Sequence, residues 1–278
     1  MSETENLLHG VIDIHIHTNP DIRTRRLSDL QLASEARRVG ARAIVIKSHL
    51  VTTMDRASIA REAVPGIDVF GGIVLNAQVG GLNAVAVDTA IKMGAKLVWL
   101  PTSFSANERC RQGKSDGVET VVNGKVVPAL LPILKLIAQS DIALATGHLT
   151  PAETLVVVEE ARKQGVAKIV VNHPEWATVD MSIDDQKRLA QFDVYFERCY
   201  ARNVGGKYDK NFERNLQAME ALGFESTIVA TDGGQVENPL WSDALAEYIG
   251  YLLNAGVPKA TVDLMTKQNP AKVLGLPV

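Results

Sequence analysis

Short β-branched runs alternate with longer amphipathic segments along the whole chain. Eight of these runs have the length and composition of buried strands. They cover residues 11–15, 43–48, 69–75, 96–100, 142–146, 168–171, 193–197 and 227–231. The segments between them repeat their apolar positions at helical spacing. Strands that alternate with helices in this way predict βα units and a parallel sheet.

Several of the predicted helices have recognisable ends. Ser28 is a candidate N-cap for a helix that stops at Gly40, and Ser182 with Asp185 opens another. Thr150 and Glu153 form a capping box before a helix that stops at Gly165. Residues 209–222 and 242–254 have the same length and apolar stripe. Eight strands with helices between them, in 278 residues and without a proline-rich or glycine-serine linker, predict an α/β protein with the (β/α)8 TIM-barrel fold as a single domain over residues 1–278.

One connection is longer than this pattern requires. Residues 102–127 follow the fourth strand, and Asn123-Gly124 lies there between two valine pairs. An Asn-Gly pair between β-branched residues is a strong hairpin signal. We therefore expect a β-hairpin-containing insertion, which serves either as a lid or pocket wall or as a surface hairpin in subunit contact.

Composition narrows the classes of function. The chain is 46% hydrophobic and 22% charged, with a net charge of −3, so neither disorder nor binding to nucleic acid or an anionic membrane is expected. No apolar run is long enough for a transmembrane helix, and the first residues lack the pattern of a secretory signal. A cytoplasmic protein with a small-molecule substrate is the expectation. The apolar segment 248–256 adds the possibility of a homo-oligomer.

Five of the six histidines lie at the ends of predicted strands. Those of the first strand are His15 and His17, which share one face in an extended chain. Further along come His49, His148 and His173, while Glu197 closes the seventh strand and Asp232 follows the eighth. The strand ends of a barrel converge on one mouth. Nitrogen and oxygen ligands gathered there predict a divalent metal site for zinc, or for manganese, iron or cobalt in its place. A metal-free acid-base site is the alternative.

Two nearby residue types refine this prediction. Asp13 precedes His15 by two positions and is expected on the histidine face, where it could hold a histidine by a hydrogen bond. The cysteines, Cys110 and Cys199, are too few for a zinc-thiolate site and are expected to be reduced and incidental.

The strand-end sequences resemble those of a known family. The matching stretches are DIHIH, TGH, NHPE, ATDGG and the tail QNPAKVLGL, and they resemble the amidohydrolase superfamily of metal-dependent hydrolases. This resemblance implies that His15, His17, His148 and Asp232 bind or orient a metal ion and its water. It also implies that His173 is a further ligand or polarises the substrate, and that Asp232 is the general base.

The chain departs from that pattern on the fourth strand. Superfamily members with two metals usually carry a bridging lysine, glutamate or cysteine there, whereas this chain has Trp99 followed by Leu100, Pro101 and Thr102. One tightly held ion is therefore favoured over two. Lys47 could supply a bridging group in modified form, hold an anionic group or developing oxyanion as a catalytic or binding cation, or form an interior ion pair with Glu197 or Asp232.

Other polar residues are candidates for substrate contact, each with a structural alternative. His49 is either a metal ligand or a substrate contact. Asn76 contacts substrate or caps backbone groups. Arg109, with Arg111, closes over an anionic substrate or remains on the solvated surface. Glu197 binds a substrate amine or acts as a second acid-base group, or else pairs with Lys47 or Arg198.

The function predicted from these residues is a metal-dependent hydrolase that cleaves a C–N bond (amide, cyclic amide or amidine) or an ester or lactone bond of a small molecule, including an anionic one. The alternatives are a decarboxylase of the same superfamily, a phosphoesterase if Lys47, Arg109 and Arg111 converge, and a non-catalytic, metal-stabilised interaction subunit.

Overall fold

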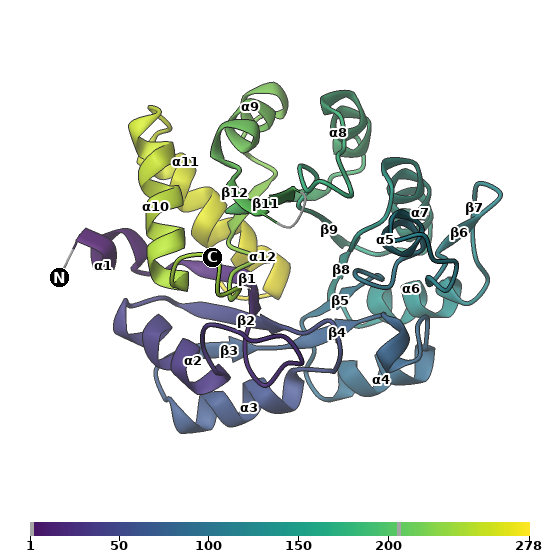
Figure 1. Cartoon of the computed structure of the whole chain (residues 1–278), viewed down its shortest axis with the longest axis horizontal. Coiled ribbons are helices and arrows are strands. Elements are labelled where there is room, and N and C mark those ends of the chain that lie inside the picture. The colour runs from purple at the N-terminus through teal and green to yellow at the C-terminus, as the bar shows by residue number, and fades with distance from the viewer. Residues whose placement is uncertain (1–2, 205–206) are drawn as a thin grey trace.

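A ring of parallel strands lies at the centre of the molecule, with helices around it (Figure 1). The computed structural model describes residues 3–204 and 207–278. The barrel strands are β1 (Ile12–His17), β2 (Ala43–Lys47), β3 (Asp68–Phe70) with β4 (Gly72–Val74), β5 (Leu97–Trp99), β8 (Ala143–Ala145), β9 (Lys168–Asn172), β10 (Tyr195–Cys199) and β13 (Thr227–Ala230). All eight predicted strands are confirmed, and each observed end lies within two residues of the predicted end.

Parallel pairing runs around the ring in sequence order. One sheet contains β1, β2 and β3, and a second runs from β4 through β5, β8, β9 and β10 to β13. Only Gly71 separates β3 from β4, where the Thr53 hydroxyl donates to the Ile46 carbonyl and accepts from the Gly72 amide. A parallel bridge between Ile16 and Gly233 joins the end of β13 to β1. The chain therefore adopts the predicted (β/α)8 barrel.

Each barrel strand is followed by a helix on the outside. These helices are α2 (Asp29–Arg38), α3 (Met54–Ala63), α4 (Ala84–Lys92), α6 (Leu130–Gln139), α7 (Pro151–Lys163), α8 (Ile183–Ala190), α9 (Phe212–Leu222) and α10 (Trp241–Asn254). The side chains of Ser28, Thr150 and Ser182 accept hydrogen bonds from the backbone at the starts of α2, α7 and α8, as predicted. Leucine, isoleucine and valine side chains between helices and strands form the outer core.

A second core fills the barrel itself. Alternate strand residues such as Ile12, Val45 and Leu97 point inward, and Val273 and Leu274 pack against the same cluster. Those two residues belong to α12, so the QNPAKVLGL tail closes one end of the barrel. The chain-terminal elements are α1 (Glu3–Leu8), α11 (Lys259–Asp263), the π-helical turn η2 (Leu264–Gln268) and α12 (Asn269–Leu274).

Three connections at the other end are elaborated. A 3-10 turn, η1 (Ala77–Val79), follows β4, and a two-stranded hairpin of β11 (Ala201–Val204) and β12 (Lys207–Lys210) follows β10. The long connection after β5 contains α5 (Ala106–Arg111) and the predicted hairpin, β6 (Val121–Val122) with β7 (Lys125–Val126). Asn123 and Gly124 have φ of 50° and 71°, as its turn requires.

The apolar segment 248–256 belongs to the core. Tyr248, Ile249 and Leu252 are at most 2% exposed and pack in the outer cluster. Tyr251 and Leu253 of the same segment are only partly buried against that cluster. Much of the segment therefore belongs to the core, and the homo-oligomer stays a prediction. In the part of the chain that the structure describes, no helix combines the length and the apolarity needed to span a bilayer.

Candidate metal centre

Five imidazole rings converge at the carboxyl ends of the barrel strands. Neighbouring ring centroids are 5.3 Å apart for His15 and His17, and 4.7 Å apart for His17 and His49. His148 and His173 are separated by 4.9 Å, and His15 and His173 by 5.8 Å. The barrel thus brings together the five histidines that the sequence analysis placed at strand ends.

The first strand delivers His15 and His17 by an irregular register. The pairing of β1 with β2 shifts between Asp13 and Ile16, which changes the face on which successive side chains lie. The Asp13 carboxylate accepts hydrogen bonds from Thr231 and from Trp241 Nε1, at 2.6 and 2.9 Å. Asp13 therefore ties β1 to β13 and α10. It also accepts a hydrogen bond from the His15 backbone amide at 3.0 Å, so it holds this histidine through the backbone and not through the ring. Burial raises the pKa of Asp13 to about 6.

Asp232 lies between the two imidazoles of β1. Its Oδ1 atom is 3.0 Å from both His15 Nε2 and His17 Nε2. Although burial opposes ionisation of Asp232, the neighbouring His15 holds the pKa of that carboxyl well below its usual range. Burial likewise disfavours a charged His15, but Asp232 and Glu197 outweigh it and raise the pKa of His15 to about 9. Asp232 is therefore a carboxylate at neutral pH.

The other four imidazoles are neutral. Burial lowers the pKa values of His17, His49 and His148, and it lowers the pKa of His173 to about 3. A neutral imidazole keeps a nitrogen lone pair, which is the form that binds a metal ion.

Polar atoms in this cluster lack the partners that buried groups normally have. Within the described residues, no group is aligned for a hydrogen bond with either ring nitrogen of His17 or His173, or with Asp232 Oδ1. His173 and Asp232 also have φ of 23° and 48°, a conformation that costs free energy outside glycine and is concentrated at functional sites. The donor set of imidazole nitrogens and a carboxylate, together with these unpaired atoms, fits a divalent ion.

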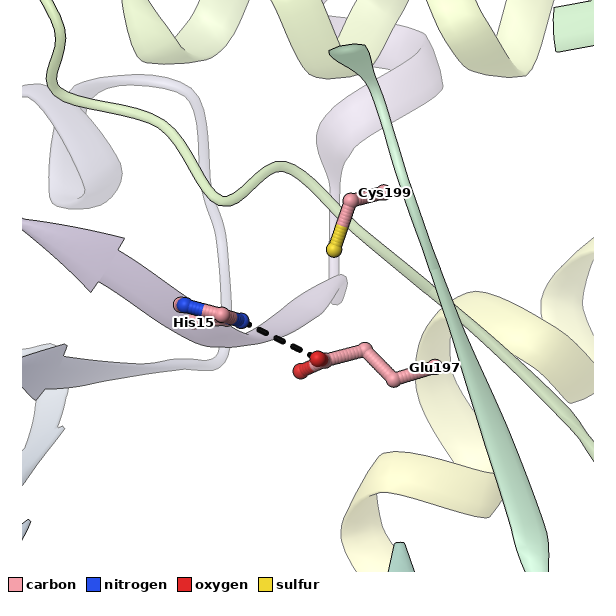
Figure 2. Close-up of side chains that lie close together, drawn as sticks. All are labelled: His15, Glu197 and Cys199. Atoms are coloured by element: carbon pink, nitrogen blue, oxygen red, sulfur yellow. Dashed lines mark hydrogen bonds and ion pairs between the residues drawn. The ribbon is translucent and has the colours of Figure 1, made fainter. Parts of the chain in front are cut away.

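Glu197 lies behind His15 and is outside the described lining of the cavity. Figure 2 shows its carboxylate directed at the His15 ring. The distance from Glu197 Oε2 to His15 Nδ1 is 3.0 Å, and Asn172 donates to the same oxygen at 2.7 Å. Glu197 is fully buried. With His15 it forms a carboxylate–histidine pair of the kind that orients metal ligands, and its contact with a substrate stays a prediction.

Cys199 completes a second group of candidate ligands with His15 and Glu197, as Figure 2 shows. Burial raises the pKa of the Cys199 thiol well above its usual range. Glu197 and Cys199 are outside the described lining of the cavity, whereas Asp232 lines it. The group formed by His15, His17 and Asp232 is therefore the better site.

His148 has its own carboxylate, which sequence reasoning missed. Glu108 on α5 places Oε1 2.8 Å from His148 Nδ1, and Thr178 donates to the same oxygen at 2.6 Å. The long connection after β5 thus reaches the centre through α5, while its hairpin packs elsewhere, with β6 and β7 against α7. The only sequence signal for Glu108 was its position in that unusually long connection.

Gly147 explains how the end of β8 approaches β5. A Cβ atom there would lie 2.4 Å from the Leu100 carbonyl oxygen, and its φ is +64°. His148, the next residue, donates its backbone N–H to the Pro101 carbonyl. The glycine of the TGH sequence therefore lets the His148 backbone dock against the end of β5.

Lys47 lies at the floor of the cluster. Its Nζ atom is 2.8 Å from His15 Nε2 and 5.6 Å from the Trp99 ring centroid, and the residue is 1% exposed. Burial lowers the pKa of Lys47. Trp99 occupies the end of β5, where the superfamily pattern would place a bridging residue.

A cavity of about 290 Å³ opens above the histidines, at the small end of the usual range for ligand sites. His49, His148 and Asp232 form part of its floor, and Trp176 and Tyr208 form an aromatic wall. The remaining lining residues come from the connections that follow the strands: Asp21, Ile22, Arg23, Arg25, Leu50, Ser103, Glu108, Gln112 and Gln235.

Asn76 and Arg109 are outside the described lining of that cavity. Asn76 is fully buried, donates to the His49 carbonyl and accepts from the Thr102 and Phe104 amides. Its alternative role, binding backbone groups, is the one that the structure shows. Arg109 pairs with Asp116 at 2.6 Å and lies over the Phe104 ring. Both residues have the contacts of their structural alternatives, and their substrate contacts stay predictions. Arg111 donates to Asn107.

Solved structures share this fold. An amidohydrolase from Pseudomonas aeruginosa superposes with a TM-score of 0.64 at 13% identity, covering 98% of each chain. An amidohydrolase from Burkholderia multivorans with bound zinc gives 0.59 at 12% identity, covering 96% of this chain and 99% of that chain. A dihydroorotase gives 0.61 at 14% identity, covering 97% of this chain and 70% of that chain. At these identities the likeness establishes the barrel fold alone.

Among curated proteins, none matches the sequence. A family model does: the one described as a family of unknown function, DUF6282, matches residues 10–197. That range runs from two residues before β1 to Glu197 in β10, so it includes all five clustered histidines. Because the match covers more than half of the chain, this protein belongs to the DUF6282 family.

Proposed function

We propose that this protein is a metal-dependent hydrolase that cleaves a C–N, ester or lactone bond of a small molecule. One observation carries the proposal: the cavity floor exposes a carboxylate, Asp232, whose oxygen lies 3.0 Å from two imidazole nitrogens that β1 supplies. In the described residues, no group is aligned for a hydrogen bond with the ring nitrogens of His17 and His173. This arrangement suits one divalent ion, for which zinc is the favoured candidate.

Each residue around the ion has a separate role in this proposal. His15, His17, His148 and Asp232 would hold the ion, with His173 as a further ligand or as a donor to the substrate. Glu197 orients His15, and Glu108 orients His148. A bound divalent ion would supply a Lewis acid that polarises a carbonyl and lowers the pKa of water.

The protein's own groups would handle the proton and the substrate. Asp232 is ionised, so it can accept a proton from the attacking water and deliver it to the leaving nitrogen or oxygen. His49 is stacked on His17 and lines the cavity, so it would contact the substrate beside the reacting bond. Lys47, under His15, would stabilise negative charge that develops at the floor.

Metal analysis followed by a hydrolysis screen tests the proposal. Purified protein is expected to contain about one divalent ion per chain. A panel of cyclic amides, lactones and aryl esters is then assayed in water enriched in oxygen-18, with and without chelator treatment. The expected result is a product that gains one labelled oxygen, loss of turnover after chelation and its return with zinc.

An Asp232→Asn variant separates catalysis from a structural metal role. The amide keeps an oxygen that can face the ion but cannot act as a base near neutral pH, so turnover should fall by at least about a hundredfold. Metal-loaded protein without turnover on any panel member, or product that carries no solvent oxygen, would contradict the hydrolase proposal.

A further inference from the structure

Arg25 is a buried cation in the wall of the catalytic cavity, on the loop between β1 and α2. Its side chain is 4% exposed, yet it lines the cavity together with His49 and Asp232. The loop holds it firmly: Asn19 donates to the Arg25 carbonyl and accepts from its amide, and Arg25 forms an antiparallel bridge with Gln235. Its charge is close enough to lower the pKa of His17.

Only one edge of the guanidinium is occupied. Arg25 Nε donates to Asp21 Oδ2 at 2.7 Å, and the other Asp21 oxygen accepts from the Arg23 amide. In the described ranges, no protein group accepts from either Nη atom of Arg25. Because a guanidinium presents a planar fork of donors, the two Nη groups remain available to a ligand.

The other cations near the cavity already have partners. Arg23 donates to Tyr208 and to the Glu237 carboxylate, and Arg26 donates to the Val236 carbonyl. Lys47 lies beneath His15 and is absent from the described cavity lining. Asp21 offsets the charge of Arg25, so recognition here would depend on directed hydrogen bonds more than on net charge.

We propose that Arg25 binds a carboxylate of the substrate, next to the bond that is cleaved. The substrate class would then be small amides, cyclic amides, lactones or esters that carry a free carboxylate. This inference rests on the proposed function, because it places the carboxylate beside the ion held by the histidines. Arg109, the other arginine considered for an anionic substrate, forms an ion pair with Asp116 and is outside the described cavity lining.

Paired hydroxamate probes test the inference without turnover. A hydroxamate binds zinc, and its far end can carry either a carboxylate or the neutral primary amide. The monohydroxamates of succinate and glutarate, each as acid and as amide, are titrated calorimetrically into the zinc-loaded protein. We expect the acid to bind about ten- to a hundredfold more tightly than the amide for at least one chain length.

Three variants locate that preference. Arg25→Gln should reduce it to less than about threefold while hydroxamate binding and zinc content remain. Arg25→Lys keeps the charge without the fork and should retain only part of the preference, which also provides a test if the glutamine variant fails to fold. Arg109→Gln is the matched control and should behave as the unchanged protein.

The outcomes separate the two proposals. Equal binding of acid and amide at both chain lengths, or a preference that survives in Arg25→Gln, would overturn the role of Arg25 and leave the metal centre standing. If no hydroxamate binds and the protein holds no zinc, the proposed function fails, and the inference that rests on it fails as well.

Discussion

Replacing Glu108 by glutamine should weaken metal binding without unfolding the protein. Among the described hydrogen bonds of Glu108, His148 is the one predicted ligand, and its Nδ1 atom lies 2.8 Å from the carboxylate. Burial alone would raise its pKa, but the hydrogen bond with His148 keeps the pKa of Glu108 below its ordinary value. The carboxylate is therefore charged, and it fixes the orientation of the ring.

The size of the effect follows from the bond that is lost. A hydrogen bond to a charged group contributes about 1.5–3 kcal/mol and a neutral one about 0.5–1.5 kcal/mol, so the exchange costs about 1–1.5 kcal/mol. That difference corresponds to a dissociation constant for zinc that is roughly five- to twelvefold higher. Glu108→Ala leaves the ring without its carboxylate and should cost about ten- to a hundredfold.

The measurement is a competition titration of metal-free protein with zinc and a chromophoric chelator. Glu159→Gln is the control, because Glu159 is half exposed on α7 and pairs only with exposed Lys163 among its described contacts. Thermal unfolding of each variant establishes that the fold is intact. If both Glu108 variants bind zinc as tightly as the control, then His148 is not a ligand that Glu108 orients, and the reasoning is refuted.

Three further predictions concern residues outside the candidate ligand set. Asn76→Ala removes hydrogen bonds to buried backbone groups of the His49 and Thr102 segments and should lower the free energy of unfolding in urea by roughly 2–3 kcal/mol; an unchanged midpoint would contradict its anchoring role. Gly147→Ala should destabilise the protein by more than about 1 kcal/mol and weaken zinc binding, because φ is +64° and the new Cβ would meet the Leu100 carbonyl. Its control is Gly250→Ala, which should be stabilising because Gly250 lies in α10 with open space around it. The hydrogen bond from Arg38 lowers the pKa of Glu35 below its ordinary value of 4.5. Ionised Glu35 therefore stabilises the fold above pH 4.5, and this contribution is lost as pH falls through the lowered pKa. Urea titrations should show that the loss of unfolding free energy in Glu35→Gln shrinks as pH falls below about 5, and a loss that stays constant with pH would contradict this.

Local pattern was enough to predict the barrel and the gathering of the histidines. Strand and helix periodicity is written in each segment, and the parallel arrangement then forces the carboxyl ends of the strands to meet. His15 and His173 are 158 positions apart in sequence, yet their positions after predicted strands placed them together, and their rings are 5.8 Å apart. The hairpin at Asn123-Gly124 was predictable for the same reason, since a two-residue turn is a local property.

Partners of the site residues depended on the paths of loops. Glu108 reaches His148 from a helix inside the long connection after β5, and Arg25 enters the cavity because the loop after β1 folds against Gln235. Asp13 lies on a different face from the histidine rings because the register of β1 shifts between Asp13 and Ile16. The alternation of faces along a regular strand does not predict such an irregularity.

The sequence by itself therefore determined the fold and the ligand atoms available to a metal, because both follow from short-range periodicity and the direction of parallel strands. Only the tertiary structure decided which carboxylates lie behind His15 and His148, and which arginine keeps free donors toward the cavity. These contacts join residues far apart in the chain. A register shift of one residue, or a different loop path, is enough to move a side chain from the cavity into a structural ion pair.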